Sequence, residues 1–289
     1  VAIVHTLFNA INTVLLIPVK KLLVKFCEVV VPDREEEEHT LVLDERLLTV
    51  PAVAVGTAFD HTVEMSALAI ESIEKSLPLI DKYDEAAAEE IKELENRIDK
   101  YEDKLGTFMV KLSKEEISDV DTNQVTKMLH TINDFERIGD HACNMVKVAK
   151  EMRDKNIAFS KEATKELSVL TDALNEILAL TKEAFAKTDV DIAFKIEPLE
   201  QVIDKLIYDI KANHITRLQS GNCTIELGFV LHDLLTNYER VSDHCSNVAV
   251  AIIETAHGSF QTHEYLRDVK RTNEEFKKDY EEYLEKFAL

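Results

Sequence analysis

The residues best suited to chemistry in this sequence are carboxylates that recur at four-residue steps. Two rows of Glu, Asp and Asn have this spacing: Glu136, Asp140 and Asn144 in the first, and Glu239, Asp243 and Asn247 in the second. The residues around the two rows also match, as in Phe135-Glu136-Arg137 and Tyr238-Glu239-Arg240. Side chains four positions apart lie one above the other on a helix, so each row predicts a helical face with oxygen ligands. The recurrence predicts two copies of one structural unit.

A pair of carboxylates with the same spacing precedes each row. The pairs are Glu95 with Asp99 in the first unit and Glu200 with Asp204 in the second. Each pair stands beside apolar positions, so adjacent helices could bring two pairs together at one seam. Four carboxylates that meet there repel one another unless a cation cancels their charge. All-oxygen ligation suits Mg, Mn, Ca or Fe, with Zn as a further candidate, and the pattern therefore predicts a metal site in each unit.

A solvated acidic surface is the alternative interpretation of these carboxylates. Arg137 and Arg240 lie within reach of them, and an exposed ion pair of this kind contributes only about 0.3–0.5 kcal/mol. The duplication of the whole pattern favours metal binding over this alternative. His141 and His244 follow the Asp of each row by one position and turn away from the row. We therefore expect them on the outer face or in a supporting role rather than as ligands.

Composition and periodicity predict an all-α protein. The sequence has Gly 6, Pro 5 and no Trp among many good helix formers. Ser113 and Glu116 have the spacing of a capping box, which would start a helix there. Three long helices are predicted in each unit, at about 52–80, 84–112, 113–153, 160–187, 191–219 and 223–256. Short connections make each set of three an antiparallel bundle, so we expect two tandem antiparallel three-helix bundles.

The apolar start of the chain predicts a membrane-related segment. Residues 1–19 carry no charged side chain, and Lys20 and Lys21 follow, as at the cytoplasmic end of a transmembrane helix. A core helix of a soluble domain is the alternative. The predicted segments are an apolar helix at 1–31, the remnant of a last transmembrane helix, an acidic linker and connector at 32–51, the bundles at 52–155 and 156–258, and a charged C-terminal helix at 259–289.

Charge and cysteine usage limit the classes of function. The formal net charge of −21 argues against a nucleic-acid partner, because phosphate backbones are bound through clustered Lys and Arg. The four cysteines are scattered and show no Cys-x-x-Cys spacing. We expect them to be reduced in a cytosolic setting.

The paired motifs resemble those of the PhoU proteins, regulators of phosphate uptake. The resemblance covers about residues 52–257, and its specific part is the Glu-Arg-aliphatic-x-Asp-x-x-x-Asn core with the preceding Glu-x-x-x-Asp pair. It implies a regulatory domain without catalytic activity, and bound metal ions, either iron or zinc clusters or magnesium or manganese. The implied ligands are Glu95, Asp99, Glu136, Asp140, Glu200, Asp204, Glu239 and Asp243. Asp103 could extend the first set, but its counterpart is Tyr208, so the two sites should differ.

The front of the chain has a second resemblance. The stretch Val4–Thr13, the Lys cluster and Leu43–Leu48 look like the connecting segment of bacterial sodium/phosphate cotransporters that carry a C-terminal PhoU domain. This resemblance implies a regulatory domain of a sodium-dependent phosphate transporter at the cytoplasmic face of the inner membrane. Its partners would be the membrane transport domain of the same protein and a second copy in a homodimer. A stand-alone PhoU-type phosphate-signalling adaptor is the alternative.

A carboxylate-bridged di-iron oxidase is the enzyme alternative. That chemistry needs two Glu-x-x-His motifs on separate helices. Glu254 and His257 form one at a predicted helix end, whereas Glu36 and His39 lie in the acidic linker. The sequence therefore favours a protein that is not an enzyme.

Overall fold

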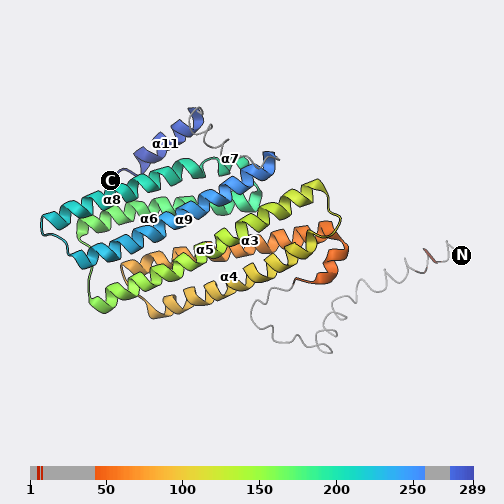
Figure 1. Cartoon of the computed structure of the whole chain (residues 1–289), viewed down its shortest axis with the longest axis horizontal. Helices are drawn as coiled ribbons and strands as arrows, with labels where there is room; N and C mark the ends of the chain where they lie inside the picture. Colours follow the sequence, from red (N-terminus) through yellow and green to blue (C-terminus); the bar gives the residue numbers. More distant parts are fainter. Residues whose placement is uncertain (1–4, 7, 9–42, 258–273) are drawn as a thin grey trace. The chain divides into compact units, whose positions relative to one another are not determined.

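Two sets of three long helices form the described part of the chain (Figure 1). The computed structural model describes residues 5, 6, 8, 43–257 and 274–289, and these contain helices and no strand. The long helices are α3 (Pro51–Ser76), α4 (Glu85–Leu112), α5 (Asp119–Lys155), α6 (Lys161–Lys187), α8 (Ile196–Gln219) and α9 (Ile225–His257). The short ones are η1 (Glu45–Thr49), η2 (Leu77–Ile80), α7 (Val190–Ala193) and α11 (Glu274–Lys286). The predicted all-α class is confirmed.

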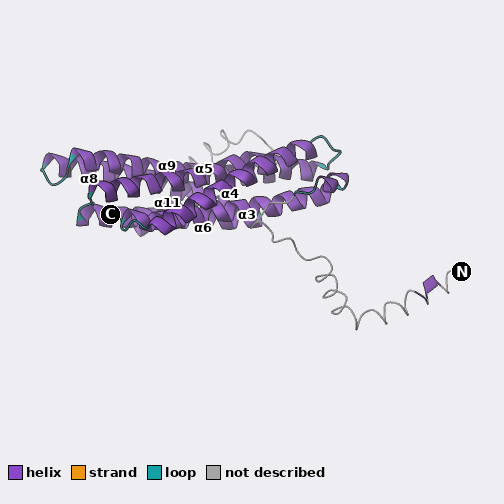
Figure 2. Cartoon of the chain, turned by 90° about the horizontal axis from the view of Figure 1, so that it is seen from below, coloured by secondary structure: helices purple, strands orange, loops and turns teal. Residues whose placement is uncertain are grey.

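Each set of long helices packs as a bundle, and the two bundles pack against each other. Helices α3, α4 and α5 contact one another, as do α6, α8 and α9. The main joint between the bundles is α5 against α9, and α3 also contacts α6. Figure 1 shows α4, α5, α9 and α8 side by side, and Figure 2 shows α3 and α6 in a separate layer. The second and third helices of both bundles are therefore neighbours in the order that the candidate site requires.

Side-chain caps and left-handed residues mark several of the helix boundaries. Asp84, Ser118 and Ser160 cap α4, α5 and α6, because each side chain accepts a hydrogen bond from a backbone N–H in the first turn. Asn156 and Thr188 end α5 and α6 in the left-handed conformation, with φ of 50° and 51°. Such residues release the chain from the helix and satisfy its last carbonyls.

Two local predictions were wrong. Ser113 does not open a helix, because its hydroxyl donates to the carbonyl of Val110 at the end of α4, and α5 begins only after Ser118. The helix predicted at 191–219 is interrupted, and α7 ends at Ala193 before α8 begins at Ile196. Pro198 lies in the first turn of α8, where its missing N–H is tolerated, so the proline starts a new helix instead of continuing the old one.

The two ends of the chain are only partly described. The apolar helix expected at 1–31 and most of the acidic linker lie outside the described residues, and so do residues 258–273. Within the described ranges, no helix combines the length and the hydropathy that a membrane span requires. The expected C-terminal helix is represented by α11, which packs on α8, and Phe287 directly after it is buried.

A buried lysine lies where the two bundles meet. Lys127 of α5 is 1% exposed, and its Nζ lies 4.6 Å from the ring centroid of Phe59 and 5.3 Å from that of Phe185. The Nζ donates a hydrogen bond to Thr188 Oγ1 at 2.8 Å. Burial lowers the pKa of Lys127 from its ordinary value to about 8. One polar contact and two aromatic faces therefore replace the water around this ammonium group.

We predict that Lys127→Met stabilises the protein at pH 7 by roughly 1–2 kcal/mol, because the substitution removes the cost of burying the charge. The folded-state pKa lies below the unfolded value, so the folded protein binds fewer protons between about pH 8 and pH 10.5. The stability of the unsubstituted protein therefore rises through this window, and its deficit against the Met variant shrinks. Thermal unfolding across the pH range measures this deficit.

Lys100→Met is the matched control, since Lys100 is an exposed lysine of α4. Its difference from the parent should stay small and unchanged with pH. A Lys127→Met variant that is less stable than the parent at every pH would show that the aromatic contacts outweigh the burial cost.

Candidate metal-binding seams

The first candidate seam lies between α4 and α5, where two pairs of carboxylates meet. Burial raises the pKa of Glu95, and the charges of Asp99 and Asp140 raise it further. Burial also raises the pKa of Asp99, with Asp140 as the next cause. The pKa of Glu136 is raised by burial and by Asp140, while Arg137 opposes the rise. Because these effects act between the two helices, the carboxylates of α4 and α5 face each other.

Close packing beside the carboxylates fixes this seam. Ile98 of α4 is fully buried, and a Cβ added at Gly139 of α5 would come within 2.9 Å of its Cδ1. Gly139 immediately precedes Asp140, so the absence of a side chain lets the helices approach where the carboxylates meet. In the second bundle Ser242 takes the corresponding place on α9 and is fully buried.

The second candidate seam lies between α8 and α9 and repeats the first. Partial burial raises the pKa of Asp204, and Glu239 and Asp243 of the facing helix add to the rise. The pKa of Asp243 is raised by burial and by Glu239, against the opposing charge of Arg240. Glu200 lies one turn before Asp204 and is partly exposed, as Glu95 is in the first seam. The eight carboxylates therefore occupy equivalent positions in the two bundles.

Basic side chains partly neutralise both seams. Arg137 Nη1 lies 3.3 Å from Asp140 Oδ2, and its Nε lies 3.4 Å from Glu136 Oε2. Arg240 makes the corresponding contact with Asp243, also at 3.3 Å. These arginines are half exposed or more, so each pair contributes little stability. They are the ion pairs that the solvated-surface alternative expects.

The donor chemistry of the seams suits a hard cation, but the side chains do not form a closed site. Glu136 Oε2 is buried and makes no hydrogen bond, although the Nε of Arg137 lies 3.4 Å from it as an ion-pair partner. Across the described ranges, however, no three His, Cys, Asp or Glu side chains gather closely enough to hold a metal ion. Loading a seam would therefore require its carboxylates to converge and its arginine to swing away.

An additional acidic residue, which the sequence pattern did not single out, lies at the first seam. Glu102 of α4 follows Asp99 by three positions, and its charge raises the pKa of Glu136. Asp103 raises the pKa of Asp99, whereas Tyr208 in the second bundle is 72% exposed and uncharged. The first seam therefore carries the larger negative charge. Its position three residues after Asp99, on the same helical face, was the sequence signal that could have identified Glu102.

The two histidines beside the rows lie between the bundles and not on an outer face. His141 Nδ1 lies 2.9 Å from Asn237 Oδ1, and His244 Nδ1 lies 2.9 Å from Asp134 Oδ1. Each histidine thus binds the residue that stands seven positions before the other histidine. Of the two expected positions, the outer face was wrong, because α9 packs against α5, while the supporting role stays a prediction. The matched Asp134 and Asn237 in the two repeats were the missed signal.

One of the two Glu-x-x-His motifs of the di-iron alternative lies within the described ranges. Glu254 and His257, at the end of α9, form the single Glu-x-x-His pair there. The chemistry needs a second such pair on another helix. The expected motif with Glu36 lies outside the described residues.

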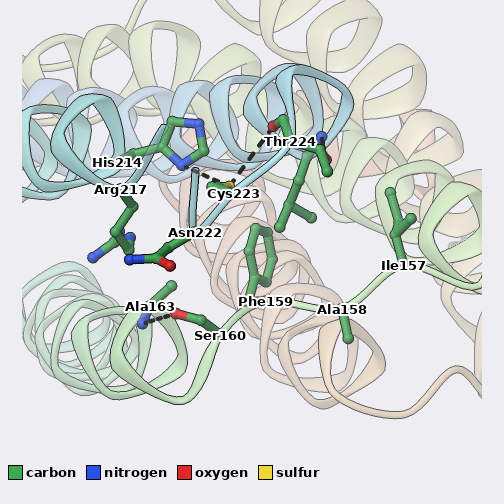
Figure 3. A pocket seen from close by; sticks show the side chains of 11 residues that line it. Ile157, Ala158, Phe159, Ser160, Ala163, His214, Arg217, Asn222, Cys223 and Thr224 are labelled. Carbon is green, nitrogen blue, oxygen red and sulfur yellow. Dashed lines mark hydrogen bonds between the residues drawn. The ribbon is translucent and has the colours of Figure 1, made fainter. Parts of the chain in front are cut away.

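A cavity of about 250 Å³ lies apart from both seams (Figure 3). It is lined by the connection at 157–160, by the end of α8 and by the start of α9. His214 Nδ1 faces Cys223 Sγ across 3.6 Å, and Arg217 of the cavity wall forms an ion pair with Glu166 at 2.8 Å. None of the eight predicted ligands lines it. The cavity is therefore separate from the seams, and the positive charge of Arg217 in its wall is neutralised by Glu166.

The described cysteines are free thiols, as expected. Cys143, Cys223 and Cys245 form no disulfide, and Cys27 lies outside the described residues. Burial raises the pKa of Cys143 to about 11 and that of Cys245 to about 12. These two thiols are therefore protonated at neutral pH and are poor ligands or nucleophiles.

Comparison with known proteins gives matches along both bundles. The model of the PhoU domain matches residues 62–149 and 167–252. A phosphate-specific transport system accessory protein, PhoU homolog 1 of Thermotoga maritima, is 27% identical over 222 residues, which cover 73% of this chain and 90% of that protein. The putative inorganic phosphate export protein YjbB of Escherichia coli is 22% identical over 258 residues, 86% of this chain. The alignment covers 47% of YjbB, so this chain spans about half its length.

Solved structures share the arrangement of the helices. The crystal structure of PhoU from Pseudomonas aeruginosa superposes with a TM-score of 0.66 at 18% identity, over 73% of this chain and all of that one. PhoU from Streptococcus pneumoniae gives a TM-score of 0.65, also at 18% identity, over 72% and 98% of the two chains. At this identity the likeness concerns the fold.

We predict that Asp99→Asn raises the melting temperature of the metal-free protein at pH 7, because it removes one of the repelling charges at the first seam. The gain should be of the order of 0.5 kcal/mol, since Asp99 is largely exposed. The folded-state pKa of Asp99 is raised, so its unfavourable contribution grows as the pH rises through that pKa. The difference between the variant and the parent should therefore shrink on acidification, as followed by thermal unfolding.

Glu93→Gln, at an exposed position of the same helix, is the control and should show no such gain. A destabilised Asp99→Asn variant at neutral pH would mean that this carboxylate makes favourable contacts that outweigh the repulsion.

Proposed function

The chain belongs to the PhoU domain family, and we propose that it is an accessory protein that regulates phosphate transport and catalyses no reaction. The observation that carries the proposal is the match of both bundles to the family, together with alignment to nearly the whole length of an accessory protein. This supports a stand-alone PhoU-type phosphate-signalling adaptor over a transporter domain.

A regulatory domain of a longer phosphate-transport protein is the second candidate. The alignment with the phosphate export protein covers 86% of this chain, against 73% for the accessory protein, and the chain spans only part of YjbB. In this form the partner would be a membrane transport domain of the same protein, at the cytoplasmic face of the inner membrane. A sodium-dependent phosphate transporter would be such a longer protein. A homodimer is compatible with both.

Metal binding at the two seams is the mechanism that we propose for regulation. A divalent cation would cancel the repulsion among the carboxylates, and all-oxygen ligands suit magnesium or manganese as well as iron, with zinc a further candidate. Glu95, Asp99, Glu136 and Asp140 would hold it in the first bundle, and Glu200, Asp204, Glu239 and Asp243 in the second. Arg137 and Arg240 would give up their carboxylates on binding, and their released side chains would change the surface offered to a partner.

Manganese titration by calorimetry tests the metal proposal. We expect at least one equivalent to bind, with Asp140→Asn weakening the first site and Asp243→Asn the second by about tenfold or more each, because each removes a charged ligand. Glu93→Gln should bind like the parent. Binding that is absent, or equally tight in the Asp140→Asn, Asp243→Asn double variant, would rule out these seams.

Phosphate flux in cells tests the regulatory proposal. In a strain that lacks its own PhoU-type accessory protein, expression of this chain should alter the uptake or release of radiolabelled phosphate at least about twofold. The Asp140→Asn, Asp243→Asn variant should lose most of this effect, while Glu93→Gln should retain it. Equal flux with and without the chain, at both high and low external phosphate, would contradict a role in phosphate transport.

A further inference from the structure

The strongest feature outside the seams is the pair of histidines at the joint between the bundles. His141 of α5 and His244 of α9 face each other with ring centroids 5.7 Å apart and an angle of 34° between the ring planes. Both side chains are partly exposed, so an ion from solution could reach them. The two residues occupy equivalent positions in the two repeats. The pair therefore combines one chemical group from each bundle.

The hydrogen bonds fix which nitrogen of His141 carries the proton. Asn237 Nδ2 donates to the carbonyl of Asp233 at 2.8 Å, so its Oδ1 is the atom that faces His141 Nδ1 at 2.9 Å. A carbonyl oxygen only accepts, and His141 Nδ1 must therefore be the donor. In the neutral ring this leaves the lone pair on Nε2.

The same reasoning applies to His244. Asp134 Oδ1 accepts a hydrogen bond from Asn247 Nδ2 at 3.1 Å and lies 2.9 Å from His244 Nδ1. The carboxylate accepts from Nδ1–H and leaves the lone pair of this ring on Nε2 as well. A carboxylate that binds the far nitrogen of a histidine is the arrangement that orients and strengthens metal-ligating imidazoles. Asp134 is 9% exposed, so little water competes with His244 for its carboxylate.

From this geometry we propose that His141 and His244 bind one transition-metal ion through their Nε2 atoms and so join the two bundles. Imidazoles on one ion, with metal–nitrogen bonds of about 2.0–2.1 Å, would have their ring centres roughly 5–6 Å apart, and the observed spacing falls in that range. Imidazole ligands favour Zn, Cu or Ni over Mg. Two protein ligands leave positions for water, so the site is an open one. Asp140 and Asp243, one residue before each histidine, add negative charge nearby.

The inference does not depend on the proposed function, because the seams offer oxygen ligands and this site offers nitrogen. Zinc titration of the parent and of the Asp140→Asn, Asp243→Asn variant separates the two, because that variant lacks one carboxylate ligand at each seam and keeps both imidazoles. We expect about one zinc ion per chain at the histidine pair. His141→Gln with His244→Gln should weaken binding at least tenfold, and Asp134→Asn should weaken it about 10- to 100-fold through His244.

His130→Gln with His232→Gln is the matched control, because these are exposed histidines of the same two helices. It should bind zinc like the parent, whereas Asp140→Asn with Asp243→Asn should keep the zinc ion at the histidine pair although it loses manganese. Unchanged zinc affinity in the His141→Gln, His244→Gln variant would overturn the proposal. So would loss of zinc from the Asp140→Asn, Asp243→Asn variant with binding intact in the histidine variant.

A spectroscopic measurement keeps the test valid if the histidine variants fold poorly. Copper(II) added to the His130→Gln, His232→Gln protein in excess magnesium should give an electron paramagnetic resonance spectrum with nitrogen couplings from two imidazoles. A spectrum with oxygen ligands alone, or with one imidazole, would contradict the site.

Discussion

Repulsion among carboxylates that the helix packing holds together is the constraint on which the rest of this structure depends. The apolar stripes of α4 and α5 pack with Ile98 against Gly139, and this contact places the acidic side chains of the two helices at one seam. Burial raises the pKa values of Glu95, Asp99 and Glu136, and the charges of the neighbouring carboxylates raise them further. The hydrophobic gain of the core therefore maintains an arrangement that electrostatics opposes.

Both bundles contain a seam of repelling carboxylates, and the two seams are connected through the joint between the bundles. The α8/α9 seam repeats the α4/α5 seam, and the third helices of the two bundles, α5 and α9, meet between them. At that joint each bundle supplies one histidine and one hydrogen-bond acceptor to the other. A change of charge at either seam thus occurs on a helix that also forms the joint. This gives metal binding at the seams a physical route to the packing of the bundles.

Much of this architecture could be predicted from the sequence, because apolar residues in long amphipathic helices recur at regular three- and four-residue steps. The range 84–112 for the second helix agrees closely with Glu85–Leu112 of α4, and the range 160–187 with Lys161–Lys187 of α6. The start of α5 was misplaced because Ser113 and Ser118 compete as caps, and spacing alone does not decide between them. The position of His141 was missed because a single helix does not show which neighbour covers each face. The spacing of the carboxylates shows which pairs on neighbouring helices face each other. It does not show that Arg137 and Arg240 form ion pairs with Asp140 and Asp243, which keep the carboxylates from forming a closed metal site.

Anomalous diffraction from crystals grown with manganese would test the metal-binding seams most directly. We expect a peak at each seam, with Asp140 and Asp243 at roughly 2.1–2.2 Å from the ion and the guanidinium groups of Arg137 and Arg240 displaced from them. Crystals that contain manganese in the solution but show no peak at either seam, with both arginine pairs intact, would contradict it.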